Sequence, residues 1–282
     1  MRKLISVVIL CLTVPVFAQN SVPEIRFKTV PNFLRYSPDM NLGEVLGVTV
    51  NSQGNIVVLN HPGSANMGPI WSNATTQLLE FDSNGRYLRE IGKGVYGIAY
   101  AHQVRFDQHD NLWVVDKGAN TVVQFDPQGY VVMNLGRREE GYHGDVELQT
   151  QEEARSFGGY LGGPTDVSWD SNENIYISDG YVNSRMAKFD RDGNFLMEWG
   201  SFGSEVGQFN LPHAMQVDRN DNIYVADRSN RRIQVFDTEG NFLRQIILDV
   251  PYPSDYQPPF AARNLDRRVR ETQPWAMCIS NT

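Results

Sequence analysis

The chain has 282 residues, and its 25 Lys and Arg against 33 Asp and Glu give a formal net charge of −8. An acidic surface repels phosphate backbones, so this balance argues against nucleic acid as a partner. Only two cysteines are present, so the stability of the fold has to come from a buried core, and the chain is long enough to form a sizeable one.

The first residues predict a secretory signal peptide over residues 1–18. Two basic residues precede an apolar run from Leu4 to Phe17, and Ala18 offers a small residue for cleavage. The run is too short for a transmembrane helix, and an uncleaved N-terminal anchor is the alternative. Cleavage would leave 23 Lys and Arg against 33 Asp and Glu, a net charge of −10, with Cys278 as the single cysteine. We therefore expect an exported protein, periplasmic or extracellular, with neither a membrane span nor an intramolecular disulfide.

Residues 19–44 form a lead-in, and residues 45–282 are built from a repeated unit. Each copy contains four short stretches of alternating apolar residues bounded by Asp, Asn and Gly, which is the signature of β-strands. The last three stretches follow one another too closely for parallel crossovers, so each unit is expected to be an antiparallel meander. The copies span about 45–92, 101–136, 163–200 and 211–248, and a fifth starts at 273–282.

The copies align at an Asn before the second strand and at an Asp–Gly turn before the fourth. The aligned Asn residues are Asn55, Asn111, Asn174 and Asn222. Four-stranded repeats of this size predict an all-β fold, a β-propeller of four-stranded blades. Insertions separate or interrupt the units at His61–Thr76, Arg137–Gly163 and Val250–Gln273. Long loops on a rigid scaffold often carry function, and plain surface excursions are the alternative.

The fifth unit stops at Thr282, before its second strand. A propeller closes by packing its last blade against its first, which protects the sheet edges. We therefore expect a truncated chain, and closure of four blades plus one strand into a small propeller is the alternative.

Two histidines occupy the same place in alternate units. His102 and His213 each lie nine residues before the aligned Asn, on the first strand, which lines the channel of a propeller. Neutral imidazoles on opposed inner strands can converge on one ion, and zinc suits such donors. A catalytic zinc typically has three protein ligands, but the unit between them has Thr165 and Asp166 at this level. Polar residues that simply line the channel are the alternative.

The turns after the second strands hold the other candidates for chemistry. Tyr181, Arg228 and Lys117 lie at corresponding turns, which open on one end of the channel. A tyrosine can act as a general base if a cation lowers its pKa, and an arginine can hold a carboxylate. In the structural alternative, Asp116, Asp179 and Asp227 cap turns while Arg185 and Arg231 form surface ion pairs.

The units resemble NHL repeats, and their motifs resemble those of the peptidyl-α-hydroxyglycine α-amidating lyases, a family of six-bladed propellers. The resemblance covers about residues 42–282 and rests on SDGYVNSR in the third unit and on LPHAMQVD and VADRSNRR in the fourth. It implies a catalytic zinc with His102 and His213 as two of three histidine ligands. The third would lie in a sixth blade, which this chain lacks.

The resemblance also implies roles for further residues. Tyr181 would be the catalytic base, Arg228 an active-site residue, and His61 would stand where the family has a further active-site arginine. The backbone carbonyls of Val48 and Val104 would help to hold a structural calcium.

The activity that the resemblance implies is the cleavage of the N–Cα bond of a C-terminal α-hydroxyglycine, which gives a peptide amide and glyoxylate. Zinc would polarise the substrate, and a truncated chain without the third ligand could be inactive. The alternative is a non-catalytic NHL-repeat propeller that binds protein or ligand. A lactonase-type propeller with carboxylate-bound calcium is disfavoured by the histidines in the channel. We expect a monomer that acts on a small molecule or peptide.

Overall fold

The computed structural model describes residues 27–62, 76–136, 160–249 and 273–279. The chain forms two compact units, residues 1–33 and 34–282, and every strand described lies in the second. The predicted signal peptide and most of the three insertions lie outside the described residues. No helix long and apolar enough to cross a membrane occurs in the described ranges.

The described strands form four sheets of four strands each. The first sheet contains β1 (Glu44–Val50), β2 (Ile56–His61), β3 (Gln77–Phe81) and β4 (Tyr87–Ile91). The second contains β5 (Ala101–Phe106), β6 (Leu112–Asp116), β7 (Thr121–Phe125) and β8 (Val131–Gly136). The third contains β9 (Asp166–Trp169), β10 (Ile175–Asp179), β11 (Arg185–Phe189) and β12 (Phe195–Trp199). The fourth contains β13 (Pro212–Val217), β14 (Ile223–Asp227), β15 (Arg232–Phe236) and β16 (Phe242–Ile247).

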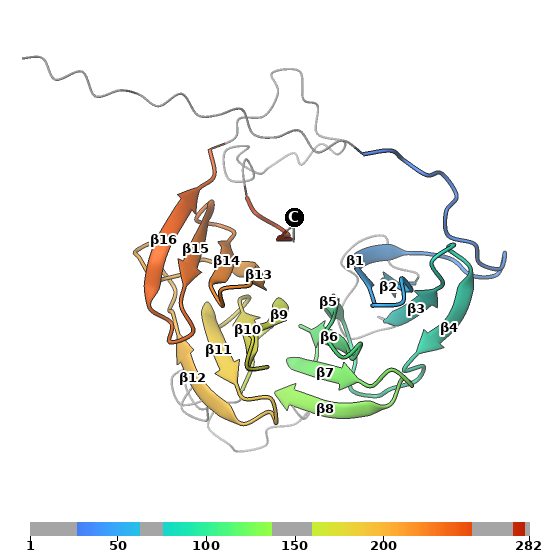
Figure 1. Ribbon diagram of the computed structural model, residues 1–282, viewed down its shortest axis with the longest axis horizontal. Coiled ribbons are helices and arrows are strands. Elements are labelled where there is room, and N and C mark those ends of the chain that lie inside the picture. Colours follow the sequence, from blue (N-terminus) through green and yellow to red (C-terminus); the bar gives the residue numbers. More distant parts are fainter. Residues whose placement is uncertain (1–26, 63–75, 137–159, 250–272, 280–282) are drawn as a thin grey trace, which may run out of the picture. The chain divides into compact units, whose positions relative to one another are not determined.

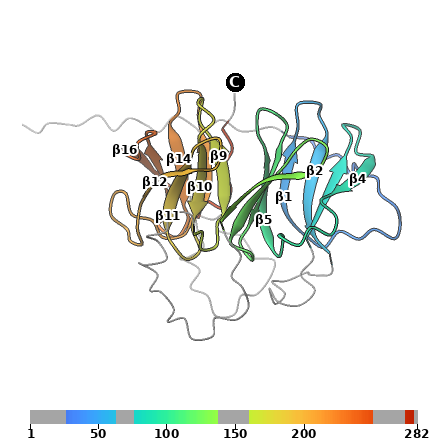
Figure 2. The ribbon, with the colours of Figure 1, turned by 90° about the horizontal axis from the view of Figure 1, so that it is seen from below.

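In each sheet the strands pair in sequence order and antiparallel, as a meander. The first strands β1, β5, β9 and β13 lie innermost and the fourth strands outermost (Figures 1 and 2). This is the blade arrangement of a β-propeller, so the predicted fold is confirmed, and we call the sheets blades 1 to 4. Residues 273–279, expected to start a fifth blade, form no strand. The fifth blade stays a prediction.

The second strands are buried because neighbouring blades cover both of their faces. Every residue of β6 (LWVVD) and β10 (IYISD) is buried, whereas half of the outer strand β8 and most of β16 are exposed. Aromatic and β-branched side chains suit such sheets, and the burial of one large apolar side chain contributes roughly 1.5–3 kcal/mol. Separate core clusters lie between blades 1 and 2, between blades 2 and 3, and between blades 3 and 4. Each boundary is therefore a packed interface that fixes the inner strands relative to one another.

The aligned Asn residues belong to the turn between the first and second strands. In blades 2 to 4 an Asp four residues earlier accepts hydrogen bonds from both the backbone and the side-chain N–H of the Asn, at 2.8–2.9 Å. The pairs are Asp107–Asn111, Asp170–Asn174 and Asp218–Asn222. The Asp–x–x–x–Asn spacing repeats because each blade makes the same turn.

Side chains of these turns also connect neighbouring blades. The Ser52 hydroxyl donates to Asp110 across the boundary between blades 1 and 2, at 2.5 Å. The Ser171 hydroxyl donates to Asp221 across the boundary between blades 3 and 4, at 2.6 Å. Blades 1 and 3 thus use the same short serine–aspartate contact to hold the next blade.

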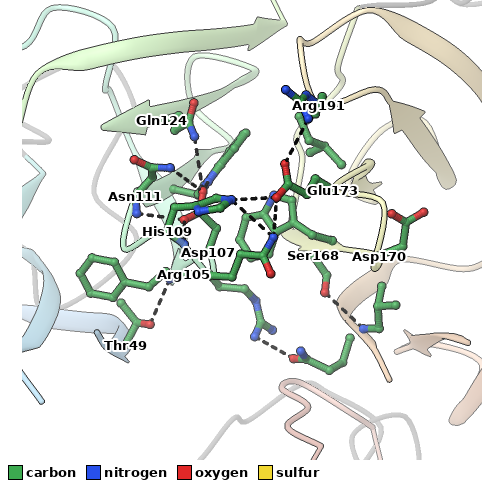
Figure 3. A pocket seen from close by; sticks show the side chains of 17 residues that line it. Thr49, Arg105, Asp107, His109, Asn111, Gln124, Ser168, Asp170, Glu173 and Arg191 are labelled. Atoms are coloured by element: carbon green, nitrogen blue, oxygen red, sulfur yellow. Dashed lines mark hydrogen bonds and ion pairs between the residues drawn. The ribbon is translucent and has the colours of Figure 1, made fainter. Parts of the chain in front are cut away.

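The boundary between blades 2 and 3 has longer side chains at these two positions. Gln108 donates to Glu173 at 2.6 Å, and His109 pairs with the same carboxylate at 2.8 Å. Below them lies a cavity of about 320 Å³, lined in part by Trp113 and Trp169 (Figure 3). The lining includes the C-terminal ends of the inner strands β5, β9 and β13. His102 lies at the start of β5, so the cavity and the channel histidines are at opposite ends of the inner strands.

Candidate functional site

A bulge in the inner strand positions each channel histidine. In β5 the pairing with β6 shifts between Ala101 and Gln103, and in β13 the pairing with β14 shifts between Pro212 and Ala214. His102 and His213 are therefore the extra residues that have no partner in the ladder. Bulges re-aim side chains and are common next to active sites. Both histidines lie on the first strand of their blade, as the sequence predicts.

The two histidines and Tyr181 form one compact cluster. The Tyr181 hydroxyl lies 3.2 Å from His102 Nε2 and 3.3 Å from His213 Nε2. The two imidazole rings are 4.7 Å apart, centroid to centroid. The structure thus brings together three residues that lie in three different blades.

The other ring nitrogens face backbone carbonyls. His102 Nδ1 lies 2.9 Å from the Thr165 carbonyl, and His213 Nδ1 lies 2.8 Å from the Trp275 carbonyl. A carbonyl only accepts hydrogen bonds, so each Nδ1 carries the proton and each Nε2 presents a lone pair. This is the usual arrangement of a metal-binding histidine and its supporting carbonyl.

The cluster has more acceptors than donors. Two Nε2 lone pairs face one phenol, which can donate only one proton. A cation between the imidazoles would satisfy both lone pairs, so the residues fit two ligands of a zinc site. Within the described ranges, no group of three or more His, Cys, Asp or Glu side chains is placed to hold a metal.

Burial keeps both imidazoles neutral. Loss of hydration, aided by neighbouring positive charge, lowers the pKa of His102 to about 3. Burial is also the main cause that lowers the pKa of His213 to about 4. Only the neutral form of imidazole binds a metal, so both side chains are in the ligand state at neutral pH.

The free energy of unfolding of the metal-free chain is expected to fall as the pH drops from about 6.5 towards 4. Unfolded histidine titrates near 6.5, whereas folded His102 and His213 stay neutral to about 3 and 4. In this window the unfolded state binds protons that the folded state excludes, which costs up to about 1.4 kcal/mol per pH unit for each histidine. Urea titrations between pH 7 and 5 measure the slope. It should be shallower in the His102→Ala/His213→Ala double variant, and an unchanged slope would contradict the assignment.

Close backbone packing places Tyr181. A Cβ atom on Gly180 would collide with the Pro212 carbonyl, so only glycine fits before the tyrosine. The Tyr181 backbone N–H donates to the Gly163 carbonyl at 3.1 Å. Burial raises the pKa of the Tyr181 phenol, and the charge and hydrogen bond of Arg228 oppose that rise.

Two cations flank Tyr181. The Arg228 guanidinium stacks on the Trp275 ring, 3.2 Å from its centroid. The Lys117 ammonium lies 4.6 Å from the Tyr181 ring centroid and 4.9 Å from that of Tyr100. Lys117 and Arg228 occupy the same repeat position in blades 2 and 4, directly after a buried aspartate.

His61 lies at that repeat position in blade 1, but its surroundings differ. Its side chain is only 3% exposed and packs on Tyr100, with ring centroids 4.2 Å apart. Its Nδ1 lies 3.8 Å from a carboxylate oxygen of Glu44, which also accepts the Tyr100 hydroxyl at 2.9 Å. Burial lowers the pKa of His61 despite Glu44. Nothing in the sequence pattern marks Glu44 or Tyr100, because neither lies in a repeated motif.

Asp116 caps its turn, as the structural alternative expected, whereas Asp179 and Asp227 each accept a turn asparagine side chain and one backbone N–H of the preceding segment. The Asp116 carboxylate accepts four backbone N–H groups, those of Ala99, Tyr100, Gly118 and Ala119. Arg185, however, is buried and pairs with buried Asp179 at 3.0 Å, so the expected surface ion pair of Arg185 is wrong. Arg231 pairs with exposed Asp249 at 3.7 Å.

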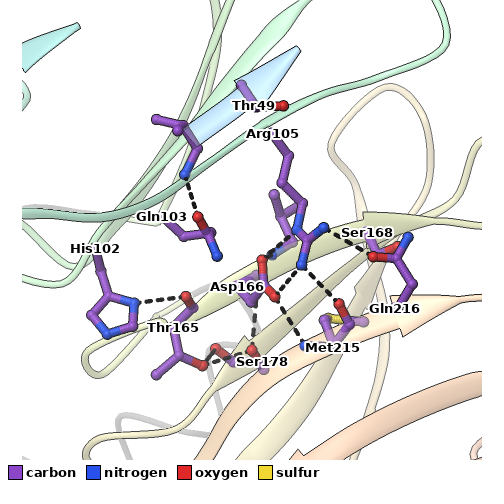
Figure 4. A network of polar contacts seen from close by, with 12 residues as sticks. Thr49, His102, Gln103, Arg105, Thr165, Asp166, Ser168, Ser178, Met215 and Gln216 are labelled. Carbon is purple, nitrogen blue, oxygen red and sulfur yellow. Dashed lines mark hydrogen bonds and ion pairs between the residues drawn. The ribbon is translucent and has the colours of Figure 1, made fainter. Parts of the chain in front are cut away.

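An ion pair with a fully buried carboxylate joins the inner strands of blades 2 and 3 (Figure 4). Arg105 binds both carboxylate oxygens of Asp166, at 2.6 and 2.7 Å, and donates to Gln216 and to the Met215 carbonyl. Asp166 also accepts the backbone N–H of Met215 at 2.9 Å. One network therefore joins blades 2, 3 and 4. Arg105 and Gln216 share one repeat position on the inner strands, which Thr49 and Ser168 occupy in blades 1 and 3. That polar position was the only sign of the network in the sequence.

Val48 and Val104 lie on the inner strands of neighbouring blades, β1 and β5. Val48 is 58% exposed and Val104 is buried. The calcium site expected at their carbonyls stays a prediction.

The comparisons with known proteins agree with this architecture. A family model, the NHL repeat, matches residues 209–236, which cover most of blade 4. A solved structure described as a streptogramin B lyase aligns with a TM-score of 0.51 at 14% identity, over 74% of this chain and 56% of that one. The chain is therefore a β-propeller built from NHL-type blades.

Curated relatives point to a narrower group. The "Probable peptidyl-alpha-hydroxyglycine alpha-amidating lyase" of Caenorhabditis elegans is 28% identical over 71% of this chain and 57% of its own length. The peptidylglycine alpha-amidating monooxygenase of Rattus norvegicus is 32% identical over 72% of this chain and 22% of its own length. The chain thus resembles the amidating lyases and spans about half of the first relative and under a quarter of the second.

Proposed function

We propose that the chain is an exported, zinc-dependent lyase that cleaves the N–Cα bond of a C-terminal α-hydroxyglycine and releases a peptide amide and glyoxylate. The observation that carries this proposal is the convergence of His102 Nε2 and His213 Nε2 on the Tyr181 hydroxyl, within 3.3 Å. The similarity to the amidating lyases supports the same reaction class.

His102 and His213 would hold the zinc through Nε2. Zinc there would supply positive charge that polarises the substrate hydroxyl and lowers the pKa of the Tyr181 phenol. Arg228 acts in the same direction, because its charge and hydrogen bond favour the phenolate.

Tyr181 would act as the base. As a phenolate it accepts the proton of the carbinol hydroxyl, and the oxygen's electron pair forms the C=O bond of glyoxylate. The N–Cα bond breaks, and its electron pair passes to the amide nitrogen. The Tyr181 phenol then returns the proton to that nitrogen, which completes the peptide amide and restores the base.

Tyr181→Phe is expected to lower kcat by about 10²–10⁴, the usual contribution of a positioned acid–base group. Zinc binding should stay within about threefold, because the phenylalanine ring keeps the packing and both Nε2 atoms remain. The matched control is Tyr130→Phe, which removes the same hydroxyl group from an exposed tyrosine of blade 2 outside the cluster. A Tyr181→Phe variant with wild-type kcat would rule out Tyr181 as the base.

Release of glyoxylate from benzoyl-α-hydroxyglycine by the zinc-supplied chain tests the reaction itself. Release that stops on chelation and returns with zinc is the expected result. No release above the uncatalysed rate would favour the non-catalytic binding propeller. Export is tested separately, by determining the N-terminus of the protein recovered outside the cytoplasm, which is expected to be Gln19.

A further inference from the structure

The ammonium group of Lys117 has no polar partner among the residues that the structure describes. Within the described part of the chain it makes two cation–π contacts, with Tyr100 and Tyr181, and it has neither an ion pair nor a hydrogen bond. Lys117 is half-buried. Burying part of an ammonium group costs free energy when its three N–H groups donate no hydrogen bonds. An anion or a water molecule that accepts from these N–H groups would remove that cost.

The carboxylates near Lys117 are already engaged. Asp116 and Glu44 both raise the pKa of Lys117, against a larger lowering by burial, so they are the acidic groups that act on it. Asp116 accepts four backbone N–H groups. Glu44 accepts the Tyr100 hydroxyl and faces His61. Neither forms an ion pair with Lys117.

Arg228, the second cation of the site, adds to the positive electrostatic potential beside Tyr181. Arg228 lowers the pKa of Lys117 through its charge and donates a hydrogen bond to Tyr181. Lys117 and Arg228 therefore both contact Tyr181, the side chain that the proposed reaction uses as its base. An anionic group of a ligand bound beside Tyr181 would meet both of them.

We infer that Lys117, together with Arg228, forms the anion-binding part of this site, and that the group bound there is a carboxylate of a small hydroxy acid or hydroxyglycine. The inference deepens the proposed function and rests on it for the identity of the substrate. It assigns the carboxylate to Lys117 and not to His61, which stands where the related lyases have a further active-site arginine. His61 is buried and lies against Glu44, so it is a poor partner for an anion.

The test compares glycolate with its neutral amide, glycolamide, as probes of equal size. Binding to the full chain is measured by calorimetry at low ionic strength, where exposed charges are screened least, once with added zinc and once with a chelator. Lys117→Met is expected to weaken glycolate binding about tenfold or more and to leave glycolamide binding unchanged. Lys117→Arg should restore glycolate binding to within about threefold of the wild type.

Arg244→Met is the matched control, because it removes a cation that lies over the ring of Tyr224, away from the site. It should bind glycolate as the wild type does. The inference is overturned if Lys117→Met matches the wild type in both buffers, or if the wild type does not prefer glycolate to glycolamide. Neither measurement requires turnover. A chain that releases no glyoxylate but loses glycolate binding in Lys117→Met would keep the anion site and refute the lyase.

Discussion

Replacing either channel histidine with alanine is expected to lower zinc affinity by at least about tenfold, a loss of about 1.4 kcal/mol. Both Nε2 atoms point at one spot and both Nδ1 protons are held by carbonyls, so each ring is preorganised as a ligand. The alanine variants remove one donor each and leave the blades intact. Zinc bound per mole of chain after dialysis against a zinc buffer measures the effect.

His109→Ala serves as the control for that measurement. His109 is an exposed histidine at the other end of the inner strands, where it pairs with Glu173. Its loss should leave zinc affinity unchanged. Unchanged affinity in both His102→Ala and His213→Ala would refute a zinc site in the channel.

Arg105→Met is expected to lower the free energy of unfolding by about 3–5 kcal/mol, the usual cost of removing one partner of a buried ion pair. Asp166 is fully buried. Without Arg105, its carboxylate would still accept the backbone N–H groups of Val167 and Met215 but would have no positive partner among the described residues. The network also joins three blades, so its loss weakens two boundaries at once. Urea unfolding of the metal-free chain measures the change.

The double variant Arg105→Met/Asp166→Leu separates charge from packing. Two apolar side chains of similar volume remove the unpaired carboxylate, so the double variant should be more stable than Arg105→Met alone. Arg244→Met, an exposed change, should alter stability by no more than about 0.5 kcal/mol. A double variant less stable than Arg105→Met would show that the cost is not electrostatic.

The blades could be predicted because a repeat amplifies weak local signals. The Asp–x–x–x–Asn turn and the alternating second strand recur in blades 2 to 4, and each recurrence has the same hydrogen bonds. The places of His102, His213 and Tyr181 on the channel side also follow from the repeat. Their roles in zinc binding and catalysis remain predictions.

The contacts that orient these residues could not be predicted. The bulges at His102 and His213 change the pairing by one residue, and nothing in the local pattern marks them. The Arg105–Asp166 pair joins residues 61 positions apart, and the stacking of Arg228 on Trp275 joins two segments with no repeat relation. Such long-range contacts depend on how blades pack, which single-sequence periodicity does not encode.

Blade 3 contributes no imidazole to the cluster, yet it holds the two that blades 2 and 4 contribute. The Thr165 carbonyl receives His102 Nδ1–H, and the Thr165 hydroxyl donates to the carbonyl of Pro212, directly before His213. A side-chain substitution at residue 165 leaves the backbone carbonyl present, so the hydrogen bond from His102 Nδ1 would remain. Sliding of one blade against the next would break it. The distance between the two imidazoles therefore depends on how blades 2, 3 and 4 are aligned, and a change in that distance would report a shift of one blade against the next.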